Sequence, residues 1–239
     1  MADRFYTPDP LGPGEYVLSG SEVHHLAAVR RFAPGDHLTL FNGDGSEYVA
    51  EILGLGKKSA TLNILRVEAT NRELPFPLVV ASALPKGDRA DFLIEKLTEL
   101  GVTRFVPLVT ARSVVQPKDS AVEKFQRAVI EASKQCGRNR LMSVDVPRTW
   151  AAFLALPDLP TNRFVLHTAE SEPGFPEPGE CVLAVGPEGG FTPEEVAAAQ
   201  AAGWRSVSLG PRVLRVETAA IAAAACAATP RVTAARSDP

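Results

Sequence analysis

From residue 78 onwards, short apolar segments alternate with segments of helical periodicity, and this alternation limits the folds open to the chain more than any other feature. LVVASAL (78–84), RFVPLVT (104–110) and CVLAV (181–185) are apolar runs of strand length. DRADFLIEKLTELG (88–101) and TPEEVAAAQAAG (192–203) have the residue pattern of helices. The alternation predicts an α/β domain with a mostly parallel sheet covered by helices on both faces.

The first seventy residues have a different character, with short alternating strands separated by turn residues. Asn42–Gly45, with the sequence NGDG, is a strong hairpin signal between two of these strands. We expect a small β-rich, barrel-like domain over 1–70, a proline-containing linker over 71–77 and the α/β domain over 78–230. Residues 231–239 are expected to form a flexible tail.

Composition and cysteine usage exclude several classes of protein. With 45% hydrophobic and 22% charged residues, the chain has the composition of a soluble globular protein. Its longest apolar run, Ala219–Ala228, is about half as long as a membrane span. Cys136, Cys181 and Cys226 are widely spaced and the histidines show no metal-ligand spacing, so neither a zinc site nor a disulfide framework is indicated. Together with an N-terminus unlike a signal peptide, these features predict a cytoplasmic protein without a metal.

The charged residues are unevenly distributed along the chain. Residues 112–140 contain 7 Lys and Arg but only 3 Asp and Glu, although the net charge of the whole chain is −3. A local basic segment on a mildly acidic protein suits a polyanionic partner such as RNA. A solvated helix face explains the same charges equally well.

A glycine-rich loop follows the apolar segment 181–185 and leads directly into the helix predicted from Thr192. Its sequence, GPEGGFTPEE, allows positive backbone angles and close approach of backbone amides to a ligand. It is neither a Walker A motif nor GxGxxG, it has no lysine, and Glu188 would repel phosphate. A neutral or cationic ligand therefore fits this loop better than a nucleotide phosphate.

Two further strand ends carry polar residues. LGPRVLRVETAA places Arg212, Arg215 and Glu217 immediately before the alanine-rich last helix, where these charges need a ligand or one another as partners. FVLHTAE places His167 and Thr168 at another strand end. Because the carboxyl ends of parallel strands share one edge of a sheet, the three segments can form the rim of one pocket.

GPEGGFTPEE followed by LGPRVLRVETAA resembles the closing motifs of the ribosomal RNA small-subunit methyltransferase E family, which is of the SPOUT class. The resemblance covers nearly the whole chain. LSGSEVHHLAAVRRFAPGDHLTLFNGDGSEYVAEI is similar to the family's PUA-like N-terminal domain. ALPKGDRADFLIEKLTELGVTRFVPLVTARSVV and EASKQCGRNR are similar to the first catalytic segment and to the glutamine–arginine helix end. Val213, Val216 and Cys136 depart from the commoner residues without changing a charged position.

The resemblance implies a trefoil-knotted catalytic domain, a homodimer with its active site near the interface, and S-adenosylmethionine as methyl donor. It implies methylation of uridine N-3 in small-subunit (16S) ribosomal RNA, as part of ribosome biogenesis. The positive sulfonium of this donor suits a loop that disfavours phosphate. The residues expected at the cofactor are His167, Thr168, Gly186, Pro187, Glu188, Gly189, Gly190, Leu209, Gly210, Arg212, Val213, Leu214 and Thr218.

The charged pair expected nearest the chemistry is Arg215 and Glu217. Arg215 could stabilise a uridine anion, and Glu217 could orient Arg215 or accept the proton. The alternative is that the two residues only close the start of the last helix. The expected RNA phosphate contacts are Arg30, Arg31, Lys86, Arg89, Arg112, Arg138 and Arg140.

Two other functions compete with this reading. A non-catalytic RNA-binding or ribosome-assembly protein could keep the fold without turnover, although the two intact motifs argue against it. A nucleotide-dependent oxidoreductase is suggested by the α/β alternation and by GLGKKSA (54–60). That glycine pair lies in the β-rich domain and opens no crossover helix, so the oxidoreductase is disfavoured.

Overall fold

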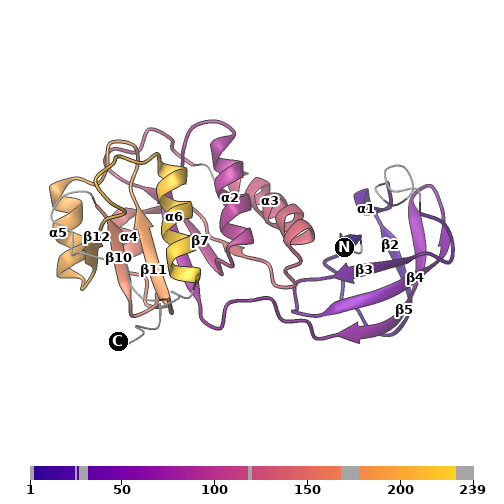
Figure 1. Ribbon diagram of the computed structural model, residues 1–239. Helices are drawn as coiled ribbons and strands as arrows, with labels where there is room; N and C mark the ends of the chain where they lie inside the picture. The colour runs from indigo at the N-terminus through magenta and orange to yellow at the C-terminus, as the bar shows by residue number, and fades with distance from the viewer. Residues whose placement is uncertain (1–2, 25, 27–31, 118–119, 168–177, 230–239) are drawn as a thin grey trace, which may run out of the picture. The chain divides into compact units, whose positions relative to one another are not determined.

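The computed structural model describes residues 3–24, 26, 32–117, 120–167 and 178–229 (Figure 1). The chain forms two compact units, one of Met1–Glu73 with Ile130–Leu141 and the other of Leu74–Val129 with Met142–Pro239. The first division falls inside the 71–77 segment expected as a linker. No sequence motif indicated that Ile130–Leu141 would join the N-terminal unit.

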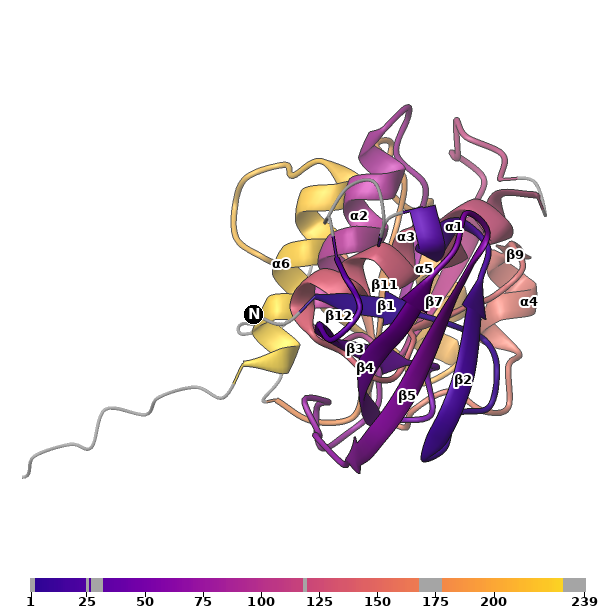
Figure 2. The same cartoon turned by 90° about the vertical axis from the view of Figure 1, so that its right-hand side faces the viewer.

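The N-terminal unit is built on a five-stranded sheet with the order β1-β3-β4-β5-β2. All neighbouring strands are antiparallel except β1 and β3, which are parallel (Figure 2). A short helix, α1 (Ser21–His24), follows β2. Alternate residues such as Leu18, Leu40, Ile52 and Leu62 point into a common core. The strands are β1 (Arg4–Tyr6), β2 (Gly14–Ser19), β3 (His37–Phe41), β4 (Glu47–Leu55) and β5 (Ser59–Glu68).

The predicted hairpin turn lies between β3 and β4. Gly43 and Gly45 have φ angles of 92° and 105°, which side-chain-bearing residues rarely adopt. The Asn42 side chain accepts a hydrogen bond from the Asp44 amide at 3.1 Å, and Asp44 accepts one from the Ser46 amide at 2.7 Å. Glycine conformation and Asx-type hydrogen bonds thus fix this turn.

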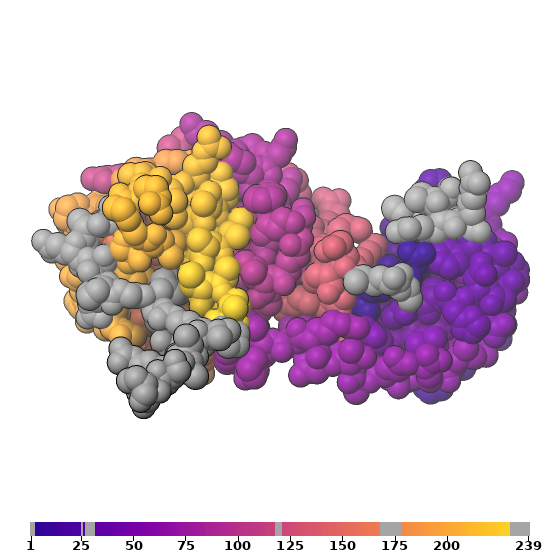
Figure 3. All heavy atoms as spheres, in the orientation of Figure 1, coloured from indigo at the N-terminus to yellow at the C-terminus, as the bar shows by residue number. Residues whose placement is uncertain are grey.

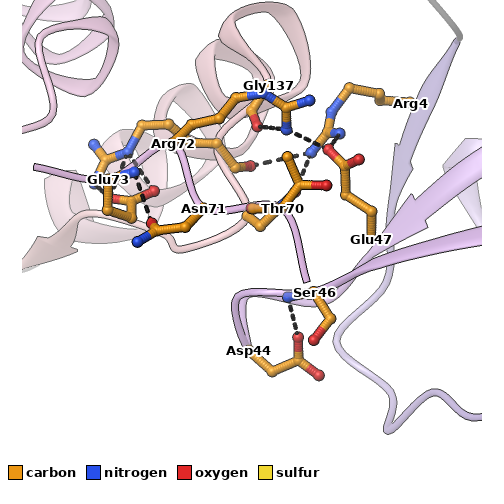
Figure 4. A network of polar contacts seen from close by, with 11 residues as sticks. Arg4, Asp44, Ser46, Glu47, Thr70, Asn71, Arg72, Glu73 and Gly137 are labelled. Carbon is orange, nitrogen blue, oxygen red and sulfur yellow. Dashed lines mark hydrogen bonds and ion pairs between the residues drawn. The ribbon is translucent and has the colours of Figure 1, made fainter. Parts of the chain in front are cut away.

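Ile130–Leu141 is held in the N-terminal unit by buried charges (Figure 4). The Glu47 carboxylate accepts hydrogen bonds from both Arg4 and Arg72. Arg72 also donates to the Gly137 carbonyl at 2.9 Å, and Arg138 pairs with Glu73 at 2.6 Å. The helix end with the sequence CGRNR therefore serves as a structural element of this unit.

The second unit contains a seven-stranded sheet in which every pairing is parallel. Its order is β12-β10-β11-β6-β7-β8, and β9 also pairs with β7. The predicted parallel α/β sheet is confirmed; β8 and β9 have two residues each, too few to show a periodicity. The strands are β6 (Leu78–Ala83), β7 (Arg104–Val109), β8 (Ser143–Val144), β9 (Arg148–Thr149), β10 (Arg163–Leu166), β11 (Cys181–Val185) and β12 (Arg205–Val207).

Helices cover both faces of this sheet. On one face, α4 (Trp150–Leu154) and α5 (Pro193–Ala201) pack on an aromatic cluster that contains Trp150, Phe153 and Trp204. On the other face lie α2 (Arg89–Glu99), α3 (Ser120–Cys136) and α6 (Val216–Ala228) (Figure 1). The buried alanines of α6 let it lie close to β6 and β11. None of the helices in the described ranges has the length and apolarity that a bilayer crossing requires.

Candidate cofactor and active site

A cavity of about 360 Å³ lies at the carboxyl edge of the parallel sheet, where β10, β11 and β12 end. This is the edge at which open α/β sheets bind ligands, and the volume suits a small molecule. All three segments that the sequence placed at the pocket rim contribute to its wall. The lining residues are Arg112, Leu166, His167, Val185–Phe191, Val207–Gly210, Arg212–Leu214, Val216 and Ala219.

The glycine loop after β11 forms one wall and is held by packing behind it. A Cβ on Gly186 would lie 3.0 Å from the Phe191 ring and 3.1 Å from its backbone nitrogen, so only glycine fits there without movement. Phe191 packs against Trp150 with ring centroids 4.5 Å apart. The Trp150 indole donates a hydrogen bond to the Glu195 carbonyl at 2.9 Å. Phe191, which itself lines the cavity, thereby fixes the glycine loop to the aromatic cluster.

The start of α5 stabilises the same loop. Thr192 accepts a hydrogen bond from the Glu195 amide, and the Glu195 carboxylate accepts one from the Thr192 amide at 2.9 Å. This capping box, with Pro193 at the first helical position, confirms the predicted helix start. The other Glu195 oxygen accepts a hydrogen bond from the Ala111 amide at 2.8 Å. Glu195 therefore connects the glycine loop to the segment that follows β7.

The loop after β12 forms the opposite wall. Gly210 has a φ angle of 106°, and its amide donates to the Ser208 hydroxyl at 3.2 Å. Val213, which is 86% exposed, borders the cavity with an apolar side chain. Leu209 and Leu214 add further apolar surface. This wall offers a hydrophobic contact surface for a flat aromatic ring.

Eleven of the expected cofactor residues line the cavity. Thr168 lies outside the described residues, and Thr218 is exposed on α6, apart from the lining. The eleven that line it are His167, Gly186, Pro187, Glu188, Gly189, Gly190, Leu209, Gly210, Arg212, Val213 and Leu214.

The structure places the expected Arg215–Glu217 pair differently. Arg215 is the N-cap of α6, with extended backbone angles, and its side chain is exposed. Glu217 is buried in the first turn of α6 and pairs with Arg89 at the start of α2, at 3.3 Å. In the described part of the chain, neither Arg215 nor Glu217 is among the residues that line the cavity. The expectation that these two residues pair with each other is therefore wrong: α6 packs on α2, which brings Arg89 to Glu217.

Arg112 is the lining residue whose position sequence reasoning missed, because it was expected only as an RNA phosphate contact. Its Nη1 donates a hydrogen bond to the Gly189 carbonyl at 2.7 Å. The strand 104–110 predicted that Arg112 would follow a carboxyl strand end. The strand order that brings this end near β11 was not predictable from the local pattern.

The other expected RNA contacts lie in different environments. Lys86 and Arg140 are exposed, and Arg89 is partly exposed. Arg138 is only 3% exposed and is paired with Glu73, which corrects the expectation that it contacts phosphate at the surface. Arg30 and Arg31 lie outside the described residues. Within the described ranges, no three His, Cys, Asp or Glu side chains gather as a metal site requires.

Comparison with known protein families shows the class of protein to which the chain belongs. Residues 72–228 match the RNA methyltransferase domain family, and residues 18–65 match the RNA methyltransferase PUA domain family. The chain is thus an RNA methyltransferase-type protein with a PUA-like N-terminal domain and a parallel α/β catalytic domain.

Individual relatives identify which family of RNA methyltransferases the chain resembles. The ribosomal RNA small subunit methyltransferase E of Synechocystis sp. is 35% identical over 220 residues, which cover 89% of this chain and 72% of the relative. The protein of the same name from Bacillus subtilis is 32% identical, with 85% and 86% covered. The chain belongs to the ribosomal RNA small subunit methyltransferase E family.

Solved structures agree with this assignment. A putative methyltransferase from Legionella pneumophila, solved in complex with S-adenosylmethionine, matches with a TM-score of 0.86 and 36% identity over 94% of this chain and 96% of that chain. A ribosomal RNA small subunit methyltransferase E from Neisseria gonorrhoeae, also bound to S-adenosylmethionine, matches with a TM-score of 0.85 and 33% identity over the same shares.

Proposed function

We propose that the protein is an S-adenosylmethionine-dependent methyltransferase that methylates N-3 of a uridine in small-subunit (16S) ribosomal RNA. The observation that carries this proposal is the cavity between the glycine loop and the loop after β12. Its wall contains the Glu188 carboxylate and several apolar side chains, and the glycine loop contains no lysine. A lining of one carboxylate and several apolar side chains suits an adenosine attached to a positive sulfonium better than a nucleotide phosphate.

Different residues of the cavity wall are proposed to bind different parts of the cofactor. Leu209, Val213 and Leu214 provide apolar surface for the adenine ring, and the backbone of Gly186–Gly190 approaches the ligand closely. Glu188 supplies a negative charge toward the sulfonium or the amino group. When bound, S-adenosylmethionine supplies the activated methyl group. The protein contributes orientation, exclusion of water and electrostatic stabilisation.

Arg215 and Glu217 keep proposed roles that follow from their positions. Arg215 comes directly after the cavity residue Leu214 and is exposed, so it is placed to contact the RNA at the rim. Glu217 acts through Arg89, holding the start of α6 against α2. Lys86, Arg89 and Arg140 are the proposed phosphate contacts among the described residues, and the N-terminal unit is the proposed RNA-binding domain.

The trefoil knot and the homodimer implied by the family resemblance, and the cytoplasmic location predicted from the composition, belong to this proposal. The last helix, α6, reaches the surface in Figure 3, and its small residues Thr218, Ala222 and Cys226 are exposed or partly exposed. Such a surface would let a second copy approach closely. Sedimentation equilibrium tests this point, and a monomer at micromolar concentration would contradict it.

Methyl transfer itself is tested on 16S RNA and on small subunits from a strain that lacks this protein. With radiolabelled S-adenosylmethionine, we expect one methyl group per RNA, recovered as 3-methyluridine after nuclease digestion and mass spectrometry. RNA binding without binding of S-adenosylmethionine in calorimetry would instead identify a non-catalytic assembly protein. A methyl group on another atom would overturn the N-3 assignment alone.

A further inference from the structure

We propose that the Arg112 guanidinium is the cation that stabilises the negative charge on the uracil ring during methyl transfer. This inference rests on the proposed function and assigns a catalytic residue to it. Arg112 follows β7 and lines the cavity, whereas Arg215, the sequence-based candidate for this role, lies outside the cavity lining. The second arginine at the cavity, Arg212, is exposed as Arg112 is, but of the two it is Arg112 that hydrogen-bonds to the glycine loop.

Arg112 is held in place before any ligand arrives. Its Nη1 donates to the Gly189 carbonyl at 2.7 Å, and its stem packs so closely on Gly189 that a Cβ there would lie 3.3 Å from the Arg112 Cβ and Cδ. On the N-terminal side, the Ala111 amide donates to Glu195 at 2.8 Å. On the other side, Ser113 accepts a hydrogen bond from the Thr110 amide at 2.9 Å. A cation fixed in this way needs little reorganisation when charge develops beside it.

The hydrogen-bond partner of Arg112 leaves its charge available. Gly189 offers a neutral carbonyl, which orients the guanidinium without cancelling its charge, and four of the five guanidinium N–H donors are not used in this bond. The positive charge of Arg112 also acts on a carboxylate at the start of α5. There the pKa of the Glu194 carboxyl is below its ordinary value, mainly through hydrogen bonds from its own amide and from Thr192, with a further contribution from Arg112.

The chemistry of N-3 methylation is assisted by such a cation. The N-3 proton leaves to solvent, and the nitrogen electron pair forms the bond to the methyl carbon as the carbon–sulfur bond breaks and its electron pair returns to sulfur. The deprotonated imide carries its charge on the two carbonyl oxygens that flank N-3. A guanidinium hydrogen-bonded to one of these oxygens favours loss of the proton and makes the nitrogen nucleophilic.

The test compares Arg112→Ala with Arg112→Lys, Arg212→Ala and Arg215→Ala, with Arg127→Ala on the exposed surface of α3 as the matched control. Single-turnover methylation is measured at saturating S-adenosylmethionine, and cofactor affinity is measured by calorimetry. We expect Arg112→Ala to slow transfer by about 10²–10³-fold with unchanged cofactor affinity, and the lysine variant to recover part of the rate. Because Arg112 is exposed, the variant should keep its fold, which circular dichroism verifies.

The decisive readout is RNA transcribed with 5-fluorouridine. Fluorine withdraws electrons and lowers the pKa of N-3, so a substrate that ionises more readily depends less on Arg112. We expect the Arg112→Ala defect to shrink on this RNA, while the defects of the Arg212 and Arg215 variants stay constant. On each RNA the rate of a variant is divided by the wild-type rate, so any effect of fluorination on RNA folding cancels in this ratio.

Three results separate failure of this inference from failure of the proposed function. If Arg112→Ala weakens cofactor binding but keeps the saturated rate, Arg112 binds the methionine carboxylate and the inference is overturned. If transfer slows equally on both RNAs, Arg112 only positions the substrate, and the inference is again overturned. If the wild-type protein forms no 3-methyluridine, the proposed function itself fails.

Discussion

At the scale of single residues, the glycine loop depends on one contact that leaves no room for a side chain. Gly186 faces the Phe191 ring and backbone at 3.0 and 3.1 Å, and Phe191 is itself fixed against Trp150. We expect Gly186→Ala to displace the loop or Phe191, both of which line the cavity, at a cost in stability of about 1–3 kcal/mol. A displacement of this wall should also weaken binding of S-adenosylmethionine by about tenfold or more, equivalent to about 1.4 kcal/mol.

Calorimetry with the cofactor and urea unfolding measure the two effects. Gly179→Ala is the matched control, because a Cβ at Gly179 would meet nothing within 4 Å. Wild-type affinity in the Gly186 variant would contradict the prediction that this wall of the cavity contacts the cofactor.

Sequence reasoning grouped the cavity-lining residues that lie in continuous motifs, but not those that distant segments bring to the cavity. Gly186–Gly190 and Leu209–Leu214 are continuous motifs at strand ends, so most of their residues could be assigned to one pocket. Arg112 lies 77 positions from its partner Gly189, and only the sheet order brings the two together. Arg138 was expected at the surface because the sequence does not reveal that its side chain is buried and paired with Glu73.

At the scale of helices and strands, the Arg89–Glu217 pair connects the starts of α2 and α6. Glu217 is 6% exposed, and its Oε2 has no hydrogen-bond partner among the described residues, so Arg89 carries most of the compensation for this buried charge. Arg89→Ala should destabilise the protein by more than the ~1 kcal/mol of an exposed pair and by less than the ~3–5 kcal/mol of a fully buried one, because Arg89 is partly exposed.

A double-mutant cycle isolates this interaction. We expect Glu217→Gln in the Arg89→Ala background to restore part of the lost stability, because it removes the unpaired buried charge. Urea unfolding of the four proteins gives the coupling energy. Additive effects of the two substitutions would show that the pair does not act as a unit.

The elements themselves were largely predictable, because α2, α3, α6 and the strands β6, β7 and β11 each show a clear periodicity or apolar run, and α5 has cap and stop residues at its ends. The elements that were not predicted from the sequence are short. The helix α4 has five residues, and its Trp150 and Phe153 belong to a core that forms only when β7 and α5 pack around them. Tertiary contacts, rather than local propensity, define such an element.

At the scale of the whole molecule, the sequence indicated two domains but not that the second part of the chain returns to the first. Ile130–Leu141 completes the N-terminal unit through charges rather than through an apolar motif, and charged residues on a helix end are usually read as solvated. In this unit, Glu47 accepts hydrogen bonds from Arg4 and Arg72, and its side chain is only 9% exposed. This carboxylate should therefore set the acid stability of the N-terminal unit.

Burial raises the pKa of the Glu47 carboxyl, but hydrogen bonds and charges from Arg72 and Arg4 outweigh it, so the pKa lies below its ordinary value of 4.5. A group with a lowered pKa in the folded state stabilises the fold fully above its unfolded pKa. This stabilisation is lost as the pH falls below about 4.5 and through the folded pKa. We expect Glu47→Gln to reduce stability at neutral pH and to flatten the loss of stability at acid pH.

Urea unfolding followed by circular dichroism, at neutral pH and at several pH values below 4.5, measures this difference. Glu15→Gln, at an exposed position on β2, is the control and should keep the wild-type pH dependence. Because the Glu47→Gln variant keeps an acceptor oxygen but loses the negative charge between Arg4 and Arg72, and Arg72 is partly exposed, the cost at neutral pH should lie below the ~3–5 kcal/mol of a broken buried pair. Parallel pH profiles of the Glu47 variant and the wild type would mean that Glu47 is already compensated by other groups and does not link Ile130–Leu141 to the N-terminal sheet.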